Sequence, residues 1–414
     1  MKRVLLLCAV LLPAACSREQ KAPLEHAPVI LISVDTLRAD RLPAYGYTKV
    51  ATPHLDALRR DAILFANAYS HCPMTLPSHV SMLTGLLPTE HGVRNNLGYR
   101  FDATKHATLP QLLKQRGYTT GAAVSSYVLR ADTGLGAAFD FYDDAIPVAA
   151  SGSASEHQRS GTATLAAARQ WISRNASQPF FFFFHLYEPH SPYTPPEPFR
   201  SRYADAYDGE VAHADAITGE FLAFLKQSGI YDRALILFTS DHGEGLWQHG
   251  EDQHGILLYR EVLHVPLLVK LPDNARAGET VSAPAALIDL LPSIVKSEGV
   301  DLLGGTIPAR RIYSETFYPR IHLGWSELRS LIDERHHFIE APRAELYDVV
   351  ADPAETKDLA ATERRVAASM RAELQRYPSA LQELQNIDPE DAKKLAALGY
   401  LGSVQPGSKS GPLP

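Results

Sequence analysis

The chain has 414 residues, of which 45% are hydrophobic and 21% are charged, proportions typical of a globular protein that buries one large core. From this length we expect one large domain with a smaller appendage. The net charge is −7 without long basic runs, which excludes the positively charged surface that nucleic-acid binding requires.

The N-terminal residues predict an export signal. Two basic residues precede an apolar run over residues 4–12, which is too short to span a bilayer. Small residues then precede Cys16, an arrangement that resembles the processing site of bacterial lipoproteins, at which Cys16 would be lipidated. We therefore expect a signal peptide over residues 1–16, a polar tether over residues 17–27 and a lipoprotein of the bacterial cell envelope, in the periplasm or at the outer membrane. Cleavage without lipidation, followed by secretion, is the alternative.

Short apolar runs alternate with helix-like stretches across residues 28–302, which we expect to form the catalytic domain. The runs are continuous rather than alternating, which predicts strands buried on both faces of a mostly parallel sheet. The alternation of strands and helices predicts an α/β sandwich. The expected strands are 29–34, 118–125, 180–186, 235–239 and 265–270, and the expected helices are 52–61, 78–84, 109–116, 162–174 and 211–227.

Polar residues follow three of the expected strands. Asp35 comes directly after the first strand, Asp241 and His242 follow the fourth, and His190 lies just beyond the third. Ligands of open α/β sheets bind at the carboxyl ends of the strands. We therefore expect these side chains to converge on one edge of the sheet.

The alternation of apolar runs and helix-like stretches ends near residue 303. Shorter alternating segments at 311–315 and 336–339, followed by a turn-rich stretch at 346–353, predict a small antiparallel subdomain. A composition rich in Gly, Ser and Pro predicts a disordered tail at the end of the chain. The expected boundaries are 303–360 for the α+β subdomain, 361–402 for C-terminal helices at about 362–376 and 389–398, and 403–414 for the tail.

The most specific stretch is residues 75–85, Thr-Leu-Pro-Ser-His-Val-Ser-Met-Leu-Thr-Gly. It resembles the nucleophile signature of the sulfatase family, in which Cys or Ser, any residue, Pro, Ser and Arg precede a short helix that ends in Leu-Thr-Gly. Thr75 occupies the nucleophile position, and His79 takes the place of the arginine. The resemblance implies an alkaline-phosphatase-like sandwich and a hydrolase of ester bonds. It covers residues 29–359, and its supporting segments are 34–40, 188–193, 240–244, 254–255, 345–348 and 352–355.

The residues around Thr75 give this motif a physical meaning. Pro77 suits the first turn of a helix, which would place Thr75 just before the free N–H groups that attract anions. A threonine hydroxyl is a weak nucleophile unless a metal or a base lowers its pKa, so a catalytic Thr75 implies an activating group nearby. An isolated Thr-x-Pro sequence also fits a residue that only caps a helix.

The activating group is expected to be a divalent cation held by Asp35, Asp241 and His242, with Thr75 completing the shell. In the sulfatase family a second aspartate follows the first, whereas this chain has Thr36, and the usual Asp-Asn pair is replaced by Asp241 and His242. An imidazole ligand favours Zn or Mn, with Mg and Ca also open.

The number of cations follows from the available ligands. One cation fits the ligands just named. A second cation would need further partners, such as His190, His254 or Asp208.

Histidines are the expected groups for binding the anion and for protonating the leaving group. The resemblance aligns His190 with a pocket histidine and His254 with a position that faces the transferred group. His185 lies inside an apolar run and is predicted to be a satisfied core residue. Weaker candidates for binding the substrate are His249, Asn95 and His79.

Threonine at position 75 narrows the expected chemistry. Sulfatases convert the family's cysteine or serine into formylglycine, whose hydrate has one hydroxyl for attack on sulfur and another for the release of sulfate. Thr75 lacks the second hydroxyl, so water or another acceptor must attack the transferred centre itself, a step natural for phosphoryl groups. We therefore predict a metal-dependent hydrolase or transferase that cleaves phosphate monoesters or diesters.

Two other functions remain open. One is a sulfate ester hydrolase that works without formylglycine, which the family resemblance favours. The other is a non-catalytic lipoprotein that binds an anionic glycan or lipid head group. The expected partners are a small-molecule, glycan or lipid ester and, through the lipid anchor, a membrane, but not nucleic acid.

Overall fold

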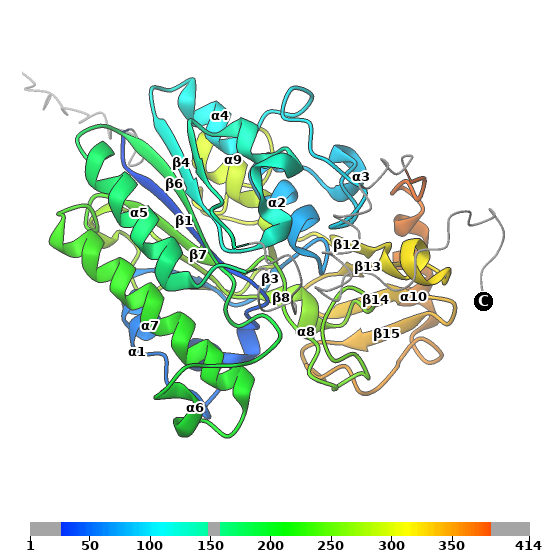
Figure 1. The fold of residues 1–414 in the computed structure, drawn as a ribbon. Coiled ribbons are helices and arrows are strands. Elements are labelled where there is room, and N and C mark those ends of the chain that lie inside the picture. Colours follow the sequence, from blue (N-terminus) through cyan, green and yellow to red (C-terminus); the bar gives the residue numbers. More distant parts are fainter. Residues whose placement is uncertain (1–25, 148–157, 382–414) are drawn as a thin grey trace, which may run out of the picture.

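The computed structural model describes residues 26–147 and 158–381. The predicted signal peptide, nearly all of the tether, the second C-terminal helix and the tail lie outside these residues. Within the described part of the chain, no helix combines the length and the apolar character needed to cross a bilayer. These residues form a large α/β unit with a smaller sheet beside it (Figure 1).

A central eight-stranded sheet organises the large unit. Its strands run parallel except for β9, which is antiparallel to both of its neighbours. The prediction of a mostly parallel sheet is therefore confirmed. In spatial order the strands are β10 (Thr280–Val281), β2 (Ile63–Phe65), β9 (Leu267–Lys270), β7 (Leu235–Thr239), β1 (Val29–Val34), β6 (Phe180–Leu186), β4 (Thr119–Ala123) and β5 (Phe141–Asp143).

Alternate residues of the central strands face two different cores. Leu31 of β1 and Phe183 of β6 pack into one core, and Ile32 and Phe184 pack into the other. Both faces of the sheet are covered, which explains why these strands are continuous apolar runs. Helices α2 (Thr75–Thr84), α4 (Leu109–Lys114) and α9 (Leu290–Val295) cover one face, and α1 (Pro53–Asp61), α5 (Gly161–Asn175) and α7 (Ala206–Gln227) cover the other (Figure 1).

The expected strand over residues 265–270 is divided into two. Strand β8 (His264–Val265) belongs to a separate three-stranded sheet with β3 (Ala68–Tyr69) and β11 (Ala285–Ala286), whereas β9 belongs to the central sheet. Pro266 lies between β8 and β9. Proline has no N–H to donate to a strand ladder, so the chain changes sheets at this residue.

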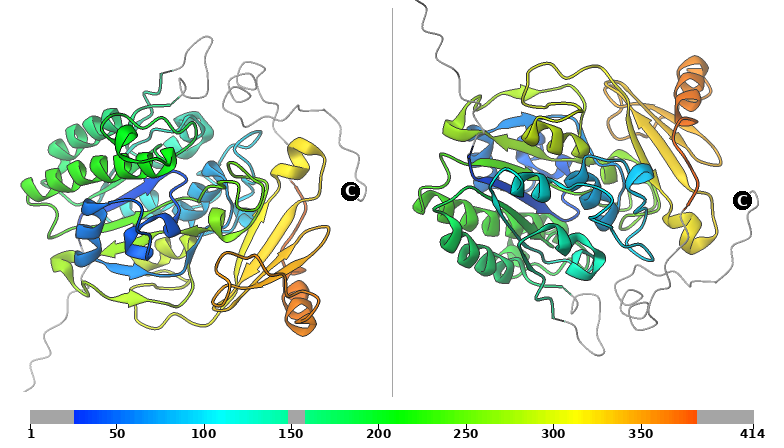
Figure 2. Two further views of the ribbon diagram at one scale, coloured as in Figure 1. Left: turned by 90° about the horizontal axis from the view of Figure 1, so that it is seen from below. Right: turned by 90° about the horizontal axis from the view of Figure 1, so that it is seen from above.

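A four-stranded antiparallel sheet packs at one end of the large unit, as Figure 2 shows from two sides. Its strands are β12 (Ile312–Thr316), β13 (Leu328–Ile332), β14 (His336–Glu340) and β15 (Glu345–Asp348), and α10 (Arg364–Leu374) covers its outer face. The predicted antiparallel subdomain is confirmed as a fold. The stretch expected to be a turn begins as β15, because Leu346 and Tyr347 bury their side chains in two different cores. Short helices α3 (Pro88–His91), α6 (Phe199–Arg202) and α8 (Arg260–Leu263) complete the structure.

A buried ion pair joins the four-stranded sheet to the segment after α3. Arg94 donates from Nε to Glu315 Oε1 at 2.7 Å and from Nη2 to Glu315 Oε2 at 2.5 Å, and both side chains are almost fully buried. Glu315 lies on β12, and Arg94 lies in the segment between α3 and α4. Two parallel hydrogen bonds of this kind fix both the distance and the orientation of their partners.

We expect Glu315→Gln to lower the free energy of unfolding by about 3–5 kcal/mol, because it leaves the Arg94 charge buried without a counter-ion. Urea-induced unfolding measures this change. A matched control is Glu220→Gln, which removes an exposed pair with Arg169 and should cost less than about 1 kcal/mol. Equal losses in the two variants would contradict the role of the buried pair.

Candidate active site

The carboxyl ends of three adjacent strands bring the expected polar residues together. Strand β1 lies between β7 and β6, so Asp35, Asp241 and His242 leave neighbouring strands at the same edge. Thr36 donates its backbone N–H to Asp241 Oδ1 at 3.3 Å. The backbone of Thr36 has a φ of 56°, a left-handed conformation that is strained for a β-branched residue. This turn directs Asp35 and the Thr36 N–H toward the end of β7.

Asp35, Asp241 and His242 have the spacing of a metal site, and we call them the metal-type group. Their ligand atoms all lie within 4.8 Å of one another. Both oxygens of Asp35 and Oδ2 of Asp241 are buried without a hydrogen-bond partner. Buried carboxylate oxygens without donors are costly, and a bound cation removes that cost. The residues present therefore fit a divalent cation, and no second group of this spacing occurs within residues 26–147 and 158–381.

His242 presents a lone pair to this group. Its Nδ1–H donates to the carbonyl of Gly243 at 2.8 Å, so Nε2 carries no proton in the neutral ring. Burial lowers the pKa of His242 to about 3 and raises the pKa of Asp241 to about 6. Burial, followed by repulsion from Asp241, also raises the pKa of Asp35. A cation would oppose both carboxylate shifts, because it favours the ionised forms.

Thr75 lies beside the group at the start of α2. Its Oγ1 is 3.5 Å from His242 Nε2, and its side chain is fully buried. The sequence predicts Thr75 just before the helix, whereas the structure makes it the first helical residue, with Pro77 still in the first turn. All ten residues of α2 are buried, and the helix ends at Gly85, whose φ of 69° lies in the left-handed region.

His79 lies behind Thr75. Its Nδ1–H donates to the carbonyl of Thr75 at 2.7 Å, and its Nε2 accepts from Ser33 Oγ at 2.9 Å. Its side chain has no solvent exposure. His79 therefore fixes the first turn of α2 against β1, and its Nδ1 also lies 3.6 Å from Asp241 Oδ2.

His185 lies beside Asp35, a position that the sequence did not reveal. It is buried in β6, as predicted, but its Nε2 has no hydrogen-bond partner and lies 3.6 Å from Asp35 Oδ2. Its Nδ1 accepts the backbone N–H of Ser125 at 3.4 Å, so Nε2 carries the proton and points it toward the carboxylate. The separation of 3.6 Å is too long for a hydrogen bond, so His185 lies beside Asp35 without holding the carboxylate in place. The available signal was its place opposite Ser33, one residue before the end of β1.

A row of imidazole rings leads outward from the group. The rings of His242 and His254 are 4.4 Å apart, and those of His254 and His190 are 5.1 Å apart. His254 donates Nδ1–H to Glu244 Oε1 at 2.8 Å, and His190 donates Nδ1–H to the carbonyl of Ser191 at 2.6 Å. Burial raises the pKa of Glu244 to about 7 and lowers the pKa of His254 to about 3.

Asn96, the neighbour of the predicted Asn95, contacts the start of α2. Asn96 Oδ1 accepts the N–H of Leu76, directly after Thr75, at 2.8 Å. Asn95 is fully buried and donates Nδ2–H to His322 Nε2 at 2.7 Å. Asn95 therefore connects this segment to the small-sheet side, and Asn96 contacts α2. His322 is brought here from a segment far along the chain, which local sequence patterns do not show.

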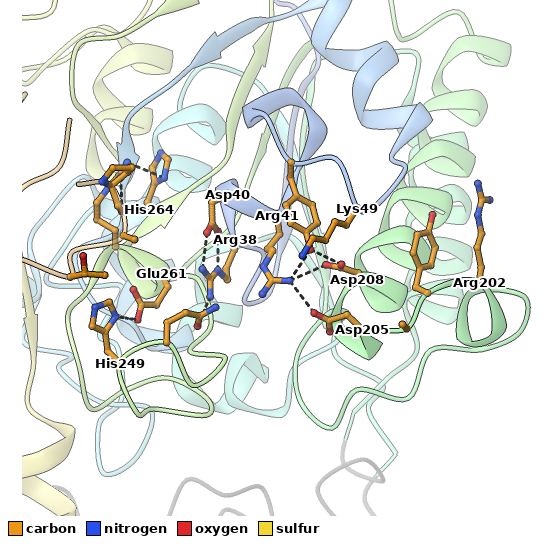
Figure 3. Close-up of a pocket in the computed structure, with 18 residues that line it drawn as sticks. Arg38, Asp40, Arg41, Lys49, Arg202, Asp205, Asp208, His249, Glu261 and His264 are labelled. Atoms are coloured by element: carbon orange, nitrogen blue, oxygen red, sulfur yellow. Dashed lines mark hydrogen bonds and ion pairs between the residues drawn. The ribbon is translucent and has the colours of Figure 1, made fainter. Parts of the chain in front are cut away.

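His249 lies in a different place from the other candidates. It borders a pocket of about 800 Å³ and pairs there with Glu261 at 2.5 Å (Figure 3). Its ring also stacks on Tyr259, with the ring centroids 3.7 Å apart. Its Nε2 donates to the carbonyl of Glu355 at 3.2 Å, so both ring nitrogens are used. Although burial opposes it, the hydrogen bond to Glu261 raises the pKa of His249. The structure does not bring His249 to the metal-type group.

Asp208, named as a partner for a second cation, borders the same pocket. It accepts from Arg41 Nη1 at 3.2 Å and from the Tyr47 hydroxyl at 2.6 Å (Figure 3). Its two oxygens are therefore occupied. The arrangement of the described residues favours one cation, at Asp35, Asp241 and His242.

Comparisons with known proteins identify the family to which the chain belongs. The family profile described as Sulfatase matches residues 28–300. The chain is 25% identical over 325 residues to the ulvan-active sulfatase of Formosa agariphila, an alignment that covers 67% of this chain and 62% of that protein. It is 27% identical over 298 residues to N-sulphoglucosamine sulphohydrolase of Homo sapiens, which covers 61% of this chain and 57% of that protein. The chain thus spans less than two thirds of the length of these relatives.

Solved structures show the same fold. The phosphonate monoester hydrolase of Agrobacterium radiobacter superposes with a TM-score of 0.70 at 20% identity, covering 85% of this chain and 95% of that one. A 2-O GAG sulfatase superposes with a TM-score of 0.70 at 19% identity, covering 93% of this chain and 99% of that one. The sandwich fold, the metal-type group at the strand ends and the profile match over most of the chain lead to one conclusion. The chain belongs to the sulfatase family.

Proposed function

We propose that this hydrolase cleaves an ester of a tetrahedral oxyanion by attack of the Thr75 hydroxyl, with phosphate esters as the favoured class. The observation that carries the proposal is the 3.5 Å distance from Thr75 Oγ1 to His242 Nε2, beside carboxylate oxygens that lack partners. A divalent cation held by Asp35, Asp241 and His242 would lower the pKa of the hydroxyl and neutralise the charge of the bound anion.

The side chains of this protein divide the remaining work. Attack by the Thr75 oxygen forms a bond to phosphorus and breaks the bond from phosphorus to the alcohol oxygen, which then takes up a proton. Water next attacks phosphorus, breaks the ester to Thr75 and restores its hydroxyl. Thr75 carries one hydroxyl only, so this second displacement has to occur at phosphorus.

The Glu244–His254 pair is suited to supplying the proton. The pKa of Glu244 is raised by burial to about 7, so the pair can hold a proton near neutral pH. The ring of His254 lies between His242 and His190, on the outward side of Thr75. His190 is the next group along this row and can bind the departing alcohol.

A sulfate ester is the second candidate substrate. The names of the curated relatives, which are sulfatases, favour this class. Threonine favours phosphate, because it cannot provide the second hydroxyl that releases sulfate by cleaving a carbon–oxygen bond. The presence of a phosphonate monoester hydrolase among the structural neighbours supports a fold that accommodates phosphorus esters.

Parallel kinetics distinguish the two classes. We would measure kcat/KM on nitrophenyl phosphate, bis(nitrophenyl) phosphate, nitrophenyl phenylphosphonate and nitrophenyl sulfate, with Zn, Mn, Mg or Ca added to metal-free enzyme. Faster turnover of a phosphorus ester supports the proposal. Faster turnover of nitrophenyl sulfate would show that the substrate is a sulfate ester. The absence of turnover of any ester would favour a protein that only binds anions.

His254→Ala should slow alkyl esters far more than nitrophenyl esters. An alkoxide needs a proton to leave, whereas a nitrophenolate does not, and general acid catalysis contributes about 10²–10⁴-fold. The measurement is kcat/KM across a series of leaving groups for the wild type and the variant. The same loss for every leaving group would assign His254 to binding rather than to proton transfer.

We also propose that Cys16 carries a lipid anchor that holds the enzyme at the cell envelope, where it meets a small-molecule, glycan or lipid ester. The support is the small-residue pattern before Cys16 and the polar residues after it. Cys16→Ala should move the full chain from the membrane fraction to the soluble fraction. An unchanged distribution would contradict lipidation at this residue.

A further inference from the structure

A second cavity borders the proposed leaving-group side of the site. It has a volume of about 250 Å³ and shares His190 with the row of rings described above. We call it the Glu210 pocket. Its acidic and imidazole lining residues are Glu188 and His190 from the segment after β6, and Glu210 and His213 from α7.

Each of the two carboxylates of the Glu210 pocket has one oxygen that accepts a hydrogen bond and one that has no partner. Glu210 is 5% exposed and accepts the N–H of Thr194 at its Oε1, at 2.9 Å, but its Oε2 is buried without a hydrogen-bond partner. Glu188 accepts the N–H of Gly161 at its Oε1, at 2.9 Å, and its Oε2 also lacks a partner. His213 Nδ1 lies 3.6 Å from Glu210 Oε2 and makes no hydrogen bond.

No lysine or arginine of the described chain compensates these acids, and the basic side chains of the pocket lining are the imidazoles of His190 and His213. The pocket lining contains no Lys or Arg, and within the described residues no Lys or Arg pairs with Glu188 or Glu210. A buried carboxylate without a counter-ion is costly. Burial accordingly raises the pKa of Glu188. The missing partner is therefore a group with positive charge and several N–H donors.

We propose that the Glu210 pocket binds an ammonium group carried by the alcohol part of the substrate. The inference rests on the proposed function, because it takes the anionic group of the ester to sit at Thr75 and the alcohol to leave past His190. An ammonium ion has three donors and no acceptor, which matches the free oxygens of Glu188 and Glu210. The substrate is then an ester with an anion at one end and an ammonium at the other.

The test is a series of ω-aminoalkyl esters, from aminoethyl to aminohexyl, each compared with the alkyl ester of equal length. We expect the wild type to prefer one aminoalkyl length by about tenfold or more in kcat/KM, because an ion pair in a desolvated pocket has a large coupling energy. Glu210→Gln should remove this preference, since the amide still accepts the Thr194 N–H but carries no charge. Glu220→Gln, on the exposed side of the same helix, should retain it.

Hydroxyalkyl esters provide the competing outcome. If they are preferred as strongly as the aminoalkyl esters, the pocket binds a polyol and the ammonium proposal is overturned. A wild type without preference for any amine overturns it as well, whether or not the Glu210 variant folds. Preference retained in a folded Glu210→Gln variant would place the ammonium site elsewhere.

Calorimetry separates this inference from the proposed function. Aminoalkyl phosphonates and alkyl phosphonates bind without being hydrolysed, and their dissociation constants can be compared on the full chain. If no ester is turned over but the aminoalkyl phosphonates still bind more tightly through Glu210, the pocket assignment holds and the catalytic proposal fails. Equal binding of the two series overturns the pocket assignment alone.

Discussion

Replacing Thr75 with alanine is expected to reduce kcat by roughly 10⁴-fold to 10⁶-fold, the loss seen when a covalent nucleophile is removed. The reason is geometric: Thr75 Oγ1 is the hydroxyl that lies 3.5 Å from His242 Nε2. The measurement is single-turnover and steady-state kinetics on the best nitrophenyl ester. Acid quenching followed by mass spectrometry should show the covalent adduct on Thr75 in the wild type and no adduct in the variant.

Two further variants serve as controls for Thr75→Ala. Thr75→Ser keeps a hydroxyl and should retain measurable turnover, whereas Thr75→Val keeps the shape without the hydroxyl and should behave like alanine. Metal content, measured by elemental analysis, should remain close to that of the wild type in all three, because Asp35, Asp241 and His242 are intact. Full activity of the valine variant would show that water, not threonine, attacks the ester.

Asp35→Asn is expected to weaken metal binding by more than about 100-fold, because even residues that only orient a ligand contribute 10-fold to 100-fold. Turnover should fall as metal binding weakens. Both oxygens of Asp35 lack protein partners, so this side chain has little to hold it in place except a cation. Elemental analysis after dialysis, and titration of activity with added metal, measure the two losses.

The same substitution should have the opposite effect on the metal-free protein. In chelator, Asp35→Asn is expected to melt at the same temperature as the wild type or higher, because a buried carboxylate beside Asp241 and Glu244 repels its neighbours and is poorly solvated. With saturating metal the wild type should melt higher, since only the wild type gains binding free energy on folding. A variant that melts lower than the wild type in chelator would show that Asp35 stabilises the fold without a cation.

Much of this architecture could be predicted from the sequence. Strands β1, β6 and β7 are apolar on both faces, so their runs are unbroken and their ends are clear. Polar residues directly after such runs, such as Asp35 and Asp241, are constrained to one edge of a parallel sheet. The metal-type group was therefore predictable, because it depends on strand order and on residues next to strand ends.

Other parts of the site depend on contacts that a local pattern does not encode. His185 is a polar residue in an apolar run, and only the pairing of β6 with β1 brings its Nε2 to Asp35. His249 lies in the same stretch of chain as His254, yet the loop turns its ring toward Glu261 and Glu355. The short distance in sequence between His249 and His254 therefore made His249 a candidate that the structure places elsewhere. No local pattern indicated that His185 lies beside Asp35.

The burial of every residue of α2 has a consequence for how such an enzyme can change over time. Thr75 lies on this helix, which cannot move without disturbing the packed interior around it, so mutations that reposition its hydroxyl are expected to destabilise the fold. Surface loops are free of that constraint. New substrates should therefore arise through exchange of the segments that frame the entrance, such as the one that carries Glu188, while the reactive centre stays where it is.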